Sequence, residues 1–192
     1  MNIPNRITIS RIMLIPIFIL LLSYPFDWGV WHVQGQDIPI THLVALIIFA
    51  IASATDWLDG YYARKYQLVT NLGKFLDPMA DKLLVSAAFI LLIAIDMAPA
   101  WIVIIIISRE FAVTGLRLVA AGEGVVLAAG QLGKFKTVLQ IVAILVLLLH
   151  NVPFASSGIP VDLILLYAAM IMTVVSGVEY FVKNWHVMGE SK

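Results

Sequence analysis

Six long apolar stretches, separated by short polar segments, dominate this chain of 192 residues and limit what it can fold into. They run over roughly 12–27, 40–60, 79–96, 98–119, 133–151 and 160–182. A helix that crosses a bilayer needs about 20 such residues. Hydrophobic residues make up 61% of the chain, and a soluble core of this size could not bury that much apolar surface. We therefore expect an all-α integral membrane protein, a bundle of six transmembrane helices forming a single domain over residues 1–192.

The basic residues are segregated along the chain, and their placement predicts its orientation in the membrane. All twelve lie in four segments, which are 1–11, 61–82, 109–136 and 183–192. The segments that alternate with these contain no Lys or Arg and are 27–39, 96–99 and 151–160. Because positive loops stay on the cytoplasmic side of a membrane, both termini should face the cytosol. A short helix over residues 2–11 is expected to lie in the cytosolic membrane interface.

The remaining composition excludes several classes of protein. Charged residues are only 12% of the chain and the formal net charge is zero, which is unlike a nucleic-acid-binding domain or a disordered chain. There are no Cys residues, so disulfides, thiolate metal sites and Cys nucleophiles are absent.

Four aspartates fall at the predicted cytosolic ends of the second and third apolar stretches. Asp56 and Asp59 are three residues apart, and Asp77 and Asp81 are four apart, so each pair shares one face of a helix. Four carboxylates at the edge of a bilayer would be very unfavourable without a cation between them. An all-oxygen set suits Mg²⁺ or Mn²⁺, and two such ions suit a displacement at phosphorus.

Two other interpretations of these aspartates stay open from the residues alone. They could pair with nearby Lys and Arg side chains and only fix the topology. They could also form the ion site of a small cation transporter, since charges within membrane segments often mark ion pathways. Against a transporter, all four aspartates lie at one membrane face, with no polar path continuing to the other.

The aspartates belong to a longer pattern, Asp56-x2-Asp59-Gly60-x2-Ala63-Arg64-x8-Gly73-x3-Asp77-x3-Asp81. This pattern resembles the signature of the CDP-alcohol phosphotransferase family of integral membrane enzymes. The resemblance implies that Asp56, Asp59 and Asp77 are metal ligands and that Asp81 is both a ligand and the general base. It further implies that the remaining motif residues line the CDP-lipid site: Gly60, Ala63, Arg64 and Gly73.

Three further segments resemble the bacterial branch of that family that makes phosphatidylglycerophosphate. They are Asn2-Ile3-Pro4-Asn5-Arg6-Ile7-Thr8 with Arg11, Ser108-Arg109-Glu110 followed by Arg117, and Gly133-Lys134-Phe135-Lys136-Thr137. The resemblance implies transfer of a phosphatidyl group from CDP-diacylglycerol to sn-glycerol 3-phosphate in the cell membrane. It also implies Mg²⁺ or Mn²⁺ as cofactor, membrane lipid as surroundings, a cytosolic active site and a homodimer. Asn5 and Thr8 are assigned by it to the CDP-lipid site.

The acceptor carries a phosphate of its own and needs a second anion site. The basic residues expected to form it are Arg109, Arg117, Lys134, Lys136 and Arg11. Arg binds phosphate through a two-pronged fork, and Lys acts as a point charge. The same residues could instead contact lipid headgroups. Inositol phosphate would use such a site equally well, whereas serine, another acceptor in the family, would not need it.

Overall fold

A computed structural model describes residues 3–65, 71–122, 124–125, 127–128 and 130–185, and the side chains of all of these except 3–6, 56–65, 71–78, 81 and 153. The described part of the chain forms six long helices, one single-turn helix and one hairpin of two strands. The long helices are α1 (Ile3–Ser23), α2 (Ile40–Lys65), α3 (Asn71–Ala94), α4 (Ala100–Gly122), α5 (Gln131–Leu148) and α7 (Val161–Lys183). The short elements are α6 (Val152–Ala155), β1 (Val30–Val33) and β2 (Gln36–Pro39).

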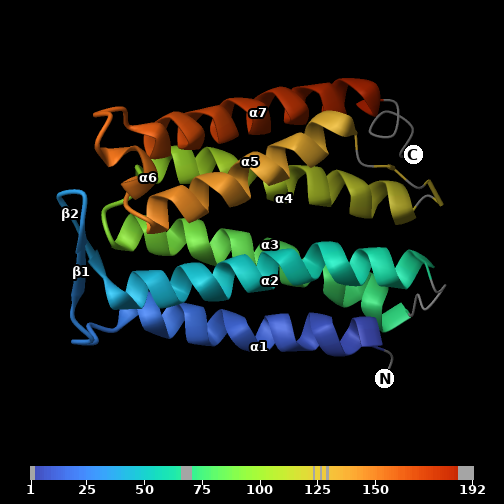
Figure 1. Ribbon diagram of the computed structural model, residues 1–192. Helices are drawn as coiled ribbons and strands as arrows, with labels where there is room; N and C mark the ends of the chain where they lie inside the picture. Colours follow the sequence, from blue (N-terminus) through green and yellow to red (C-terminus); the bar gives the residue numbers. More distant parts are fainter. Residues whose placement is uncertain (1–2, 66–70, 123, 126, 129, 186–192) are drawn as a thin grey trace.

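Consecutive long helices run in opposite directions along one bundle (Figure 1). At one end α1 begins, α2 ends, α3 begins and α7 ends, and we call this the basic end. The hairpin and α6 lie at the opposite end (Figure 1). The alternation follows from the six apolar stretches, each of which is long enough for one helix along the bundle.

The long helices form two groups that share one core. In the first group α1 packs against α2 and α3, and in the second α7 packs against α4 and α5. Contacts of α3 with α4 and α5, and of α2 with α5, join the groups. Phe18, Phe49 and Phe89 are fully buried in this core, and the rings of the first two lie 5.9 Å apart. Large apolar side chains also cover the outside, as expected of a surface that faces lipid.

Among the described residues, two helices are long and apolar enough to cross a membrane by length and composition, α5 and α7. Shorter apolar segments lie in α1, α2 and α3, at Ile7–Ser23, Ile40–Thr55 and Lys82–Ala94. Helix α4 has 23 residues, as many as α7, but it does not meet this criterion because it carries three charged residues, Arg109, Glu110 and Arg117. The prediction of a mainly helical chain with apolar helices is confirmed.

The fold differs from the prediction in its first 40 residues. The prediction of a separate short helix over residues 2–11 is wrong, because α1 is one continuous helix from Ile3 to Ser23. Thr8 and Arg11, one turn apart, are both buried, so this part of α1 packs within the protein. Within the segment 27–39, which contains no Lys or Arg, the chain forms the β1–β2 hairpin, so it is not strictly all-α. Gln34 and Gly35 have φ of 51° and 77°, the positive values that a tight hairpin turn requires.

Candidate acceptor site beside the aspartate motif

A polar cavity of about 180 Å³ lies among α3, α4, α5 and α7, in the half of the bundle nearer the basic end. Among the described side chains, its wall contains five basic groups and two carboxylates, which together carry a net formal charge of +3. These charged residues are Lys82, Arg109, Arg117, Lys134, Lys136, Glu110 and Glu179. Excess positive charge in a water-poor site attracts a small anion more strongly than it would in water.

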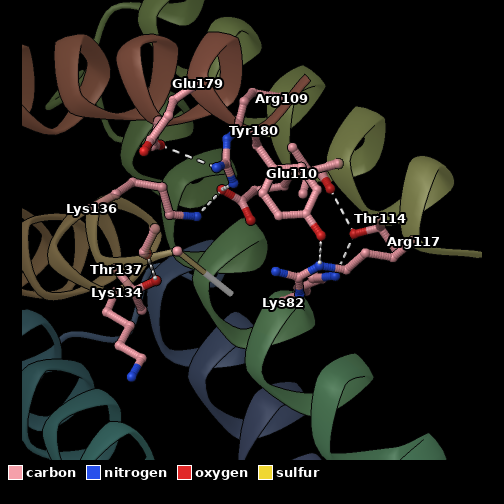
Figure 2. Close-up of a pocket in the computed structure, with 14 residues that line it drawn as sticks. Lys82, Arg109, Glu110, Thr114, Arg117, Lys134, Lys136, Thr137, Glu179 and Tyr180 are labelled. Atoms are coloured by element: carbon pink, nitrogen blue, oxygen red, sulfur yellow. Dashed lines mark hydrogen bonds and ion pairs between the residues drawn. The ribbon is translucent and has the colours of Figure 1, made fainter. Parts of the chain in front are cut away.

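Three of the charged side chains point toward one another in this cavity (Figure 2). Arg109 and Glu110 lie near the middle of α4, and Lys136 reaches them from the first turns of α5. The Lys136 amine donates a hydrogen bond to Glu110 Oε1, and Arg109 Nη1 lies 3.5 Å from the same oxygen. Only 5% of the Lys136 side chain is exposed, so its charge depends on this carboxylate. Glu110 is therefore a partner for the cations, as its position beside Arg109 suggests.

Arg117, two turns further along α4, is held by Tyr180 of α7. Arg117 Nε donates a hydrogen bond of 3.0 Å to the Tyr180 hydroxyl. The guanidinium carbon also lies 5.2 Å from the centre of the Tyr180 ring, within range of a cation–π contact. Arg117 also lines the cavity, and neither contact uses its terminal guanidinium nitrogens, which remain donors for an anion.

Lys82 connects the cavity to the aspartate motif. Its amine donates a hydrogen bond to the Thr114 hydroxyl, which in turn donates one of 2.7 Å to the backbone carbonyl of Glu110. Lys82 lines the cavity and follows Asp81 directly in the sequence. Because consecutive Cα atoms are about 3.8 Å apart, Lys82 extends into the cavity from a backbone position next to that of Asp81.

The two lysines of the Gly133–Thr137 segment point in different directions. Lys136 is buried, and only 4% of it is exposed, whereas Lys134 is exposed. In Figure 2 the Lys134 amine points away from Arg109, Glu110 and Lys136. Residues two apart on a helix lie on nearly opposite faces, so only one of the pair can face the cluster.

The aspartates lie at the basic end of the bundle by the course of the backbone. Asp56 and Asp59 lie in the last turns of α2, and Asp77 and Asp81 lie within the first three turns of α3. Their side chains lie outside those that the structure describes, as do those of the other predicted CDP-lipid residues Asn5, Gly60, Ala63, Arg64 and Gly73. Among the described side chains, no group of three or more acidic residues or histidines could hold a metal ion. The donor chemistry of the four aspartates fits Mg²⁺ or Mn²⁺, since all their ligand atoms are oxygens.

Thr8 and Arg11 lie on α1, away from the lining of the cavity. Both are buried, with 0% and 1% exposed, on the helix that packs against α2 and α3. Neither is among the residues that line the cavity described above. The structure therefore brings Arg109, Arg117 and Lys136 of the predicted acceptor residues together. Lys134 lines the cavity with its amine pointing away, and Arg11 lies with the first group of helices.

Helix α7 supplies cavity residues that the sequence reasoning missed. Ser176, Glu179 and Tyr180 line the cavity, and Gly177 lies against Arg109. The signal for them was present, because a serine and a glutamate interrupt the last apolar stretch near its basic end. Hydropathy alone averages over these polar residues within the stretch 160–182 and does not show what they face.

Comparison with known proteins identifies similar chains of nearly the same length. The model of a family described as CDP-alcohol phosphatidyltransferase matches residues 1–175. A Bacillus subtilis (strain 168) protein named CDP-diacylglycerol–glycerol-3-phosphate 3-phosphatidyltransferase is 60% identical over 99% of this chain and 98% of its own. A Rickettsia typhi protein of the same name is 39% identical over 94% and 95% of the two chains. A Mycobacterium tuberculosis protein named probable phosphatidylglycerophosphate synthase is 36% identical over 98% and 84%.

Proposed function

The chain belongs to the CDP-alcohol phosphatidyltransferase family, and on that premise we propose that it transfers the phosphatidyl group of CDP-diacylglycerol to sn-glycerol 3-phosphate. The products are phosphatidylglycerophosphate and CMP, so the reaction is a step in the synthesis of anionic phospholipids. One observation carries the assignment of the site: Lys82, the neighbour of Asp81, lines the same cavity as Arg109 and Lys136. A cavity with an excess of basic side chains among its described residues therefore lies beside the motif that resembles the family's catalytic signature, which supports its proposed role in binding the acceptor.

The charge of the cavity supports an acceptor that carries a phosphate. Arg109 and Arg117 can each present two N–H groups to phosphate oxygens, and Lys136 adds a point charge. The net charge of +3 on the described side chains of the wall would compensate a bound phosphate dianion. Serine has no phosphate to place there, so these cations would be superfluous for it. Glycerol 3-phosphate meets the requirement and is the acceptor in the name of the Bacillus subtilis relative.

The donor would bind at the aspartate motif, with its acyl chains in lipid and its diphosphate at the basic end. Asp56, Asp59, Asp77 and Asp81 would hold one or two Mg²⁺ or Mn²⁺ ions, which neutralise the diphosphate and the charge that develops on CMP. We also propose that Asn5, Thr8 and the small and basic residues of the motif contact the CDP-lipid. Backbone positions in α2 and α3 support this, because both helix ends with the motif lie at the basic end.

Within that site we propose that Asp81 is the general base. A hydroxyl oxygen of glycerol 3-phosphate attacks the phosphorus of the phosphatidyl group, and the bond from that phosphorus to the oxygen of CMP breaks. The Asp81 carboxylate takes the proton of the attacking hydroxyl, which requires hydrogen-bond reach of about 3 Å. Lys82, the neighbour of Asp81 on α3, lines the cavity. Glycerol 3-phosphate could therefore bind with its phosphate in the cavity and its attacking hydroxyl near Asp81.

In the membrane we propose six spans, with both termini and the active site on the cytosolic side of a bacterial cell membrane. The long helices have 18 to 26 residues, which at about 1.5 Å per residue is close to the thickness of a hydrocarbon core of about 30 Å. The basic residues gather toward one end of the bundle, in agreement with the positive-inside rule. Labelling of single cysteines introduced into this Cys-free chain, from either side of sealed vesicles, would test the arrangement.

The resemblance to the family also implies a homodimer, which we keep as part of the proposal. Large apolar side chains on the outside of α4 and α7, such as Ile104 and Val182, would face lipid or a second copy equally well. The mass of the purified protein in detergent, corrected for bound detergent, distinguishes a monomer from a dimer.

The reaction can be tested directly by the release of CMP from purified protein in detergent. We expect release with CDP-diacylglycerol, Mg²⁺ or Mn²⁺, and glycerol 3-phosphate, and its loss when a chelator removes the metal. Parallel reactions would contain serine, inositol or inositol phosphate as the acceptor. Release with one of these in place of glycerol 3-phosphate would contradict the acceptor, and ion flux into liposomes without any lipid product would restore the transporter hypothesis.

The different directions of Lys134 and Lys136 give a second prediction. We expect Lys136→Ala to raise the KM for glycerol 3-phosphate about tenfold or more, because a buried charge in the cavity is lost and, of the two described cations that pair with Glu110, Arg109 alone remains. Lys134→Ala should have a clearly smaller effect, since its amine points away from the cluster. Steady-state kinetics with each substrate varied in turn would measure both, and an equal effect of the two variants would contradict this assignment.

A further inference from the structure

One face of α7 forms the back wall against which Arg109 lies. Arg109 Nη2 donates a hydrogen bond of 3.1 Å to the Ser176 hydroxyl, while Nη1 faces Glu110. Ser176 itself is fixed, because only 2% of it is exposed and its hydroxyl donates to the backbone carbonyl of Thr173 at 3.1 Å. The guanidinium is thus held between a carboxylate of its own helix and a hydroxyl of the neighbouring one.

The residue after Ser176 determines how closely Arg109 can approach α7. A Cβ atom added to Gly177 would lie 2.9 Å from Cγ of Arg109 and 3.3 Å from its Nε. The first distance is shorter than real contacts between such atoms, so one of the two side chains would have to move. Arg109 Nε is buried and has no hydrogen-bond partner among the described residues, which agrees with its position over the bare backbone of Gly177.

A glycine at position 177 lowers the stability of helix α7, so its presence there is best explained by what it packs against. Glycine is the poorest helix former after proline, and Gly177 lies in the last third of a regular helix of 23 residues. Small residues in membrane helices commonly allow a neighbouring element to approach closely. Here the neighbour is the charged side chain of Arg109, which lies flat along α7 and only 13% of which is exposed.

We propose that Ser176 and Gly177 are positioning residues, which set the place of the Arg109 guanidinium and thereby the affinity of the cavity for the acceptor phosphate. The proposal rests on the function proposed above. Gly177 provides the space in which the arginine stem lies, and Ser176 fixes the orientation of the fork. Both residues act through Arg109, and neither needs to touch the substrate. Changes at these two residues should therefore weaken the binding of the phosphorylated acceptor. Binding of the CDP-lipid, which is proposed to occur at the aspartate motif, should stay the same.

The Gly177→Ala variant tests this by separating the two Michaelis constants. We expect its KM for glycerol 3-phosphate to rise about tenfold, since small displacements of a positioning group have large kinetic effects. Its KM for CDP-diacylglycerol should stay within about twofold of wild type. Gly115→Ala on α4 is the matched control, because nothing lies within 4 Å of a Cβ at that position. This control should leave both constants unchanged.

A double variant shows whether the effect passes through Arg109. If it does, Gly177→Ala adds nothing further once Arg109 is already Ala, because interacting residues are not additive. An unchanged acceptor KM in Gly177→Ala, or an equal additional loss in the double variant, would overturn the proposal. These outcomes leave the function intact as long as wild type and Gly115→Ala release CMP with glycerol 3-phosphate. Failure of wild type to do so would refute the function itself.

Ser176→Ala provides an independent test if Gly177→Ala does not give folded protein in a thermal melt in detergent. This variant removes the hydroxyl that accepts from Arg109 and introduces no new atoms. We expect a rise of at least about threefold in the KM for glycerol 3-phosphate, with the donor KM unchanged. An acceptor KM equal to that of wild type would overturn the positioning role of this face of α7.

Discussion

Replacing Asp81 by asparagine should lower the turnover number by at least about 10³-fold while CDP-diacylglycerol still binds. Asparagine has the size of aspartate and keeps one carbonyl oxygen as a possible metal ligand, but it cannot take a proton from the attacking hydroxyl. The loss should therefore appear in kcat much more than in donor affinity. Initial rates of CMP release, together with equilibrium binding of labelled CDP-diacylglycerol to the purified variant, would measure the two quantities separately.

The same chemical change can be made at the other end of α3 as a control. Asp96 lies just beyond this helix with a φ of 59°, a conformation that asparagine adopts as readily as aspartate. Asp96→Asn should retain the turnover of the wild-type protein. Near-normal turnover in Asp81→Asn would remove Asp81 as the base, and loss of donor binding would show that its main role is to hold the metal.

Truncating Arg109 to alanine should lower kcat/KM for glycerol 3-phosphate by about 10²-fold or more, with little change in the KM for CDP-diacylglycerol. The guanidinium is largely buried and lies in the charged cluster with Glu110 and Lys136. Its removal leaves the Glu110 carboxylate facing the place of the phosphate with one cation fewer to offset it. Kinetics with one substrate varied at a time would measure both constants.

Arg109→Lys separates charge from geometry at the same position. Lysine keeps the positive charge but lacks the planar fork that reaches Ser176 and a phosphate together. We expect it to recover only part of the loss seen in Arg109→Ala. Full recovery would mean that charge alone is sufficient, and an unchanged acceptor KM in Arg109→Ala would exclude this arginine from the acceptor site.

Hydropathy predicted the number and order of the long helices, because each apolar stretch became one of them. It placed the boundaries poorly where a helix continues through polar residues. Helix α3 begins at Asn71, eight residues before the apolar stretch, and α1 begins at Ile3. A helix needs backbone hydrogen bonds rather than apolar side chains, so a window of hydrophobicity is shorter than the helix wherever the helix continues through a charged motif.

The site was predictable to the extent that its residues are charged and close together in sequence. Arg109, Arg117 and Lys136 were chosen for their charge and do meet in one cavity. The choice between Lys134 and Lys136 required the helical phase of α5, which the charges alone do not contain. The sequence shows no sign of the proposed role of Gly177. That role follows from the close approach of Arg109, whose Cγ would lie 2.9 Å from a Cβ atom at position 177.

The two groups of helices divide the proposed reaction between them. The aspartate motif lies in α2 and α3, whereas all but one of the described residues that line the proposed acceptor cavity lie on or just before α4, α5 and α7. Lys82 and Thr114 meet where the groups join. Substitutions confined to α4, α5 and α7 would therefore reshape the acceptor side of the proposed site and leave the helices that carry the aspartates unchanged.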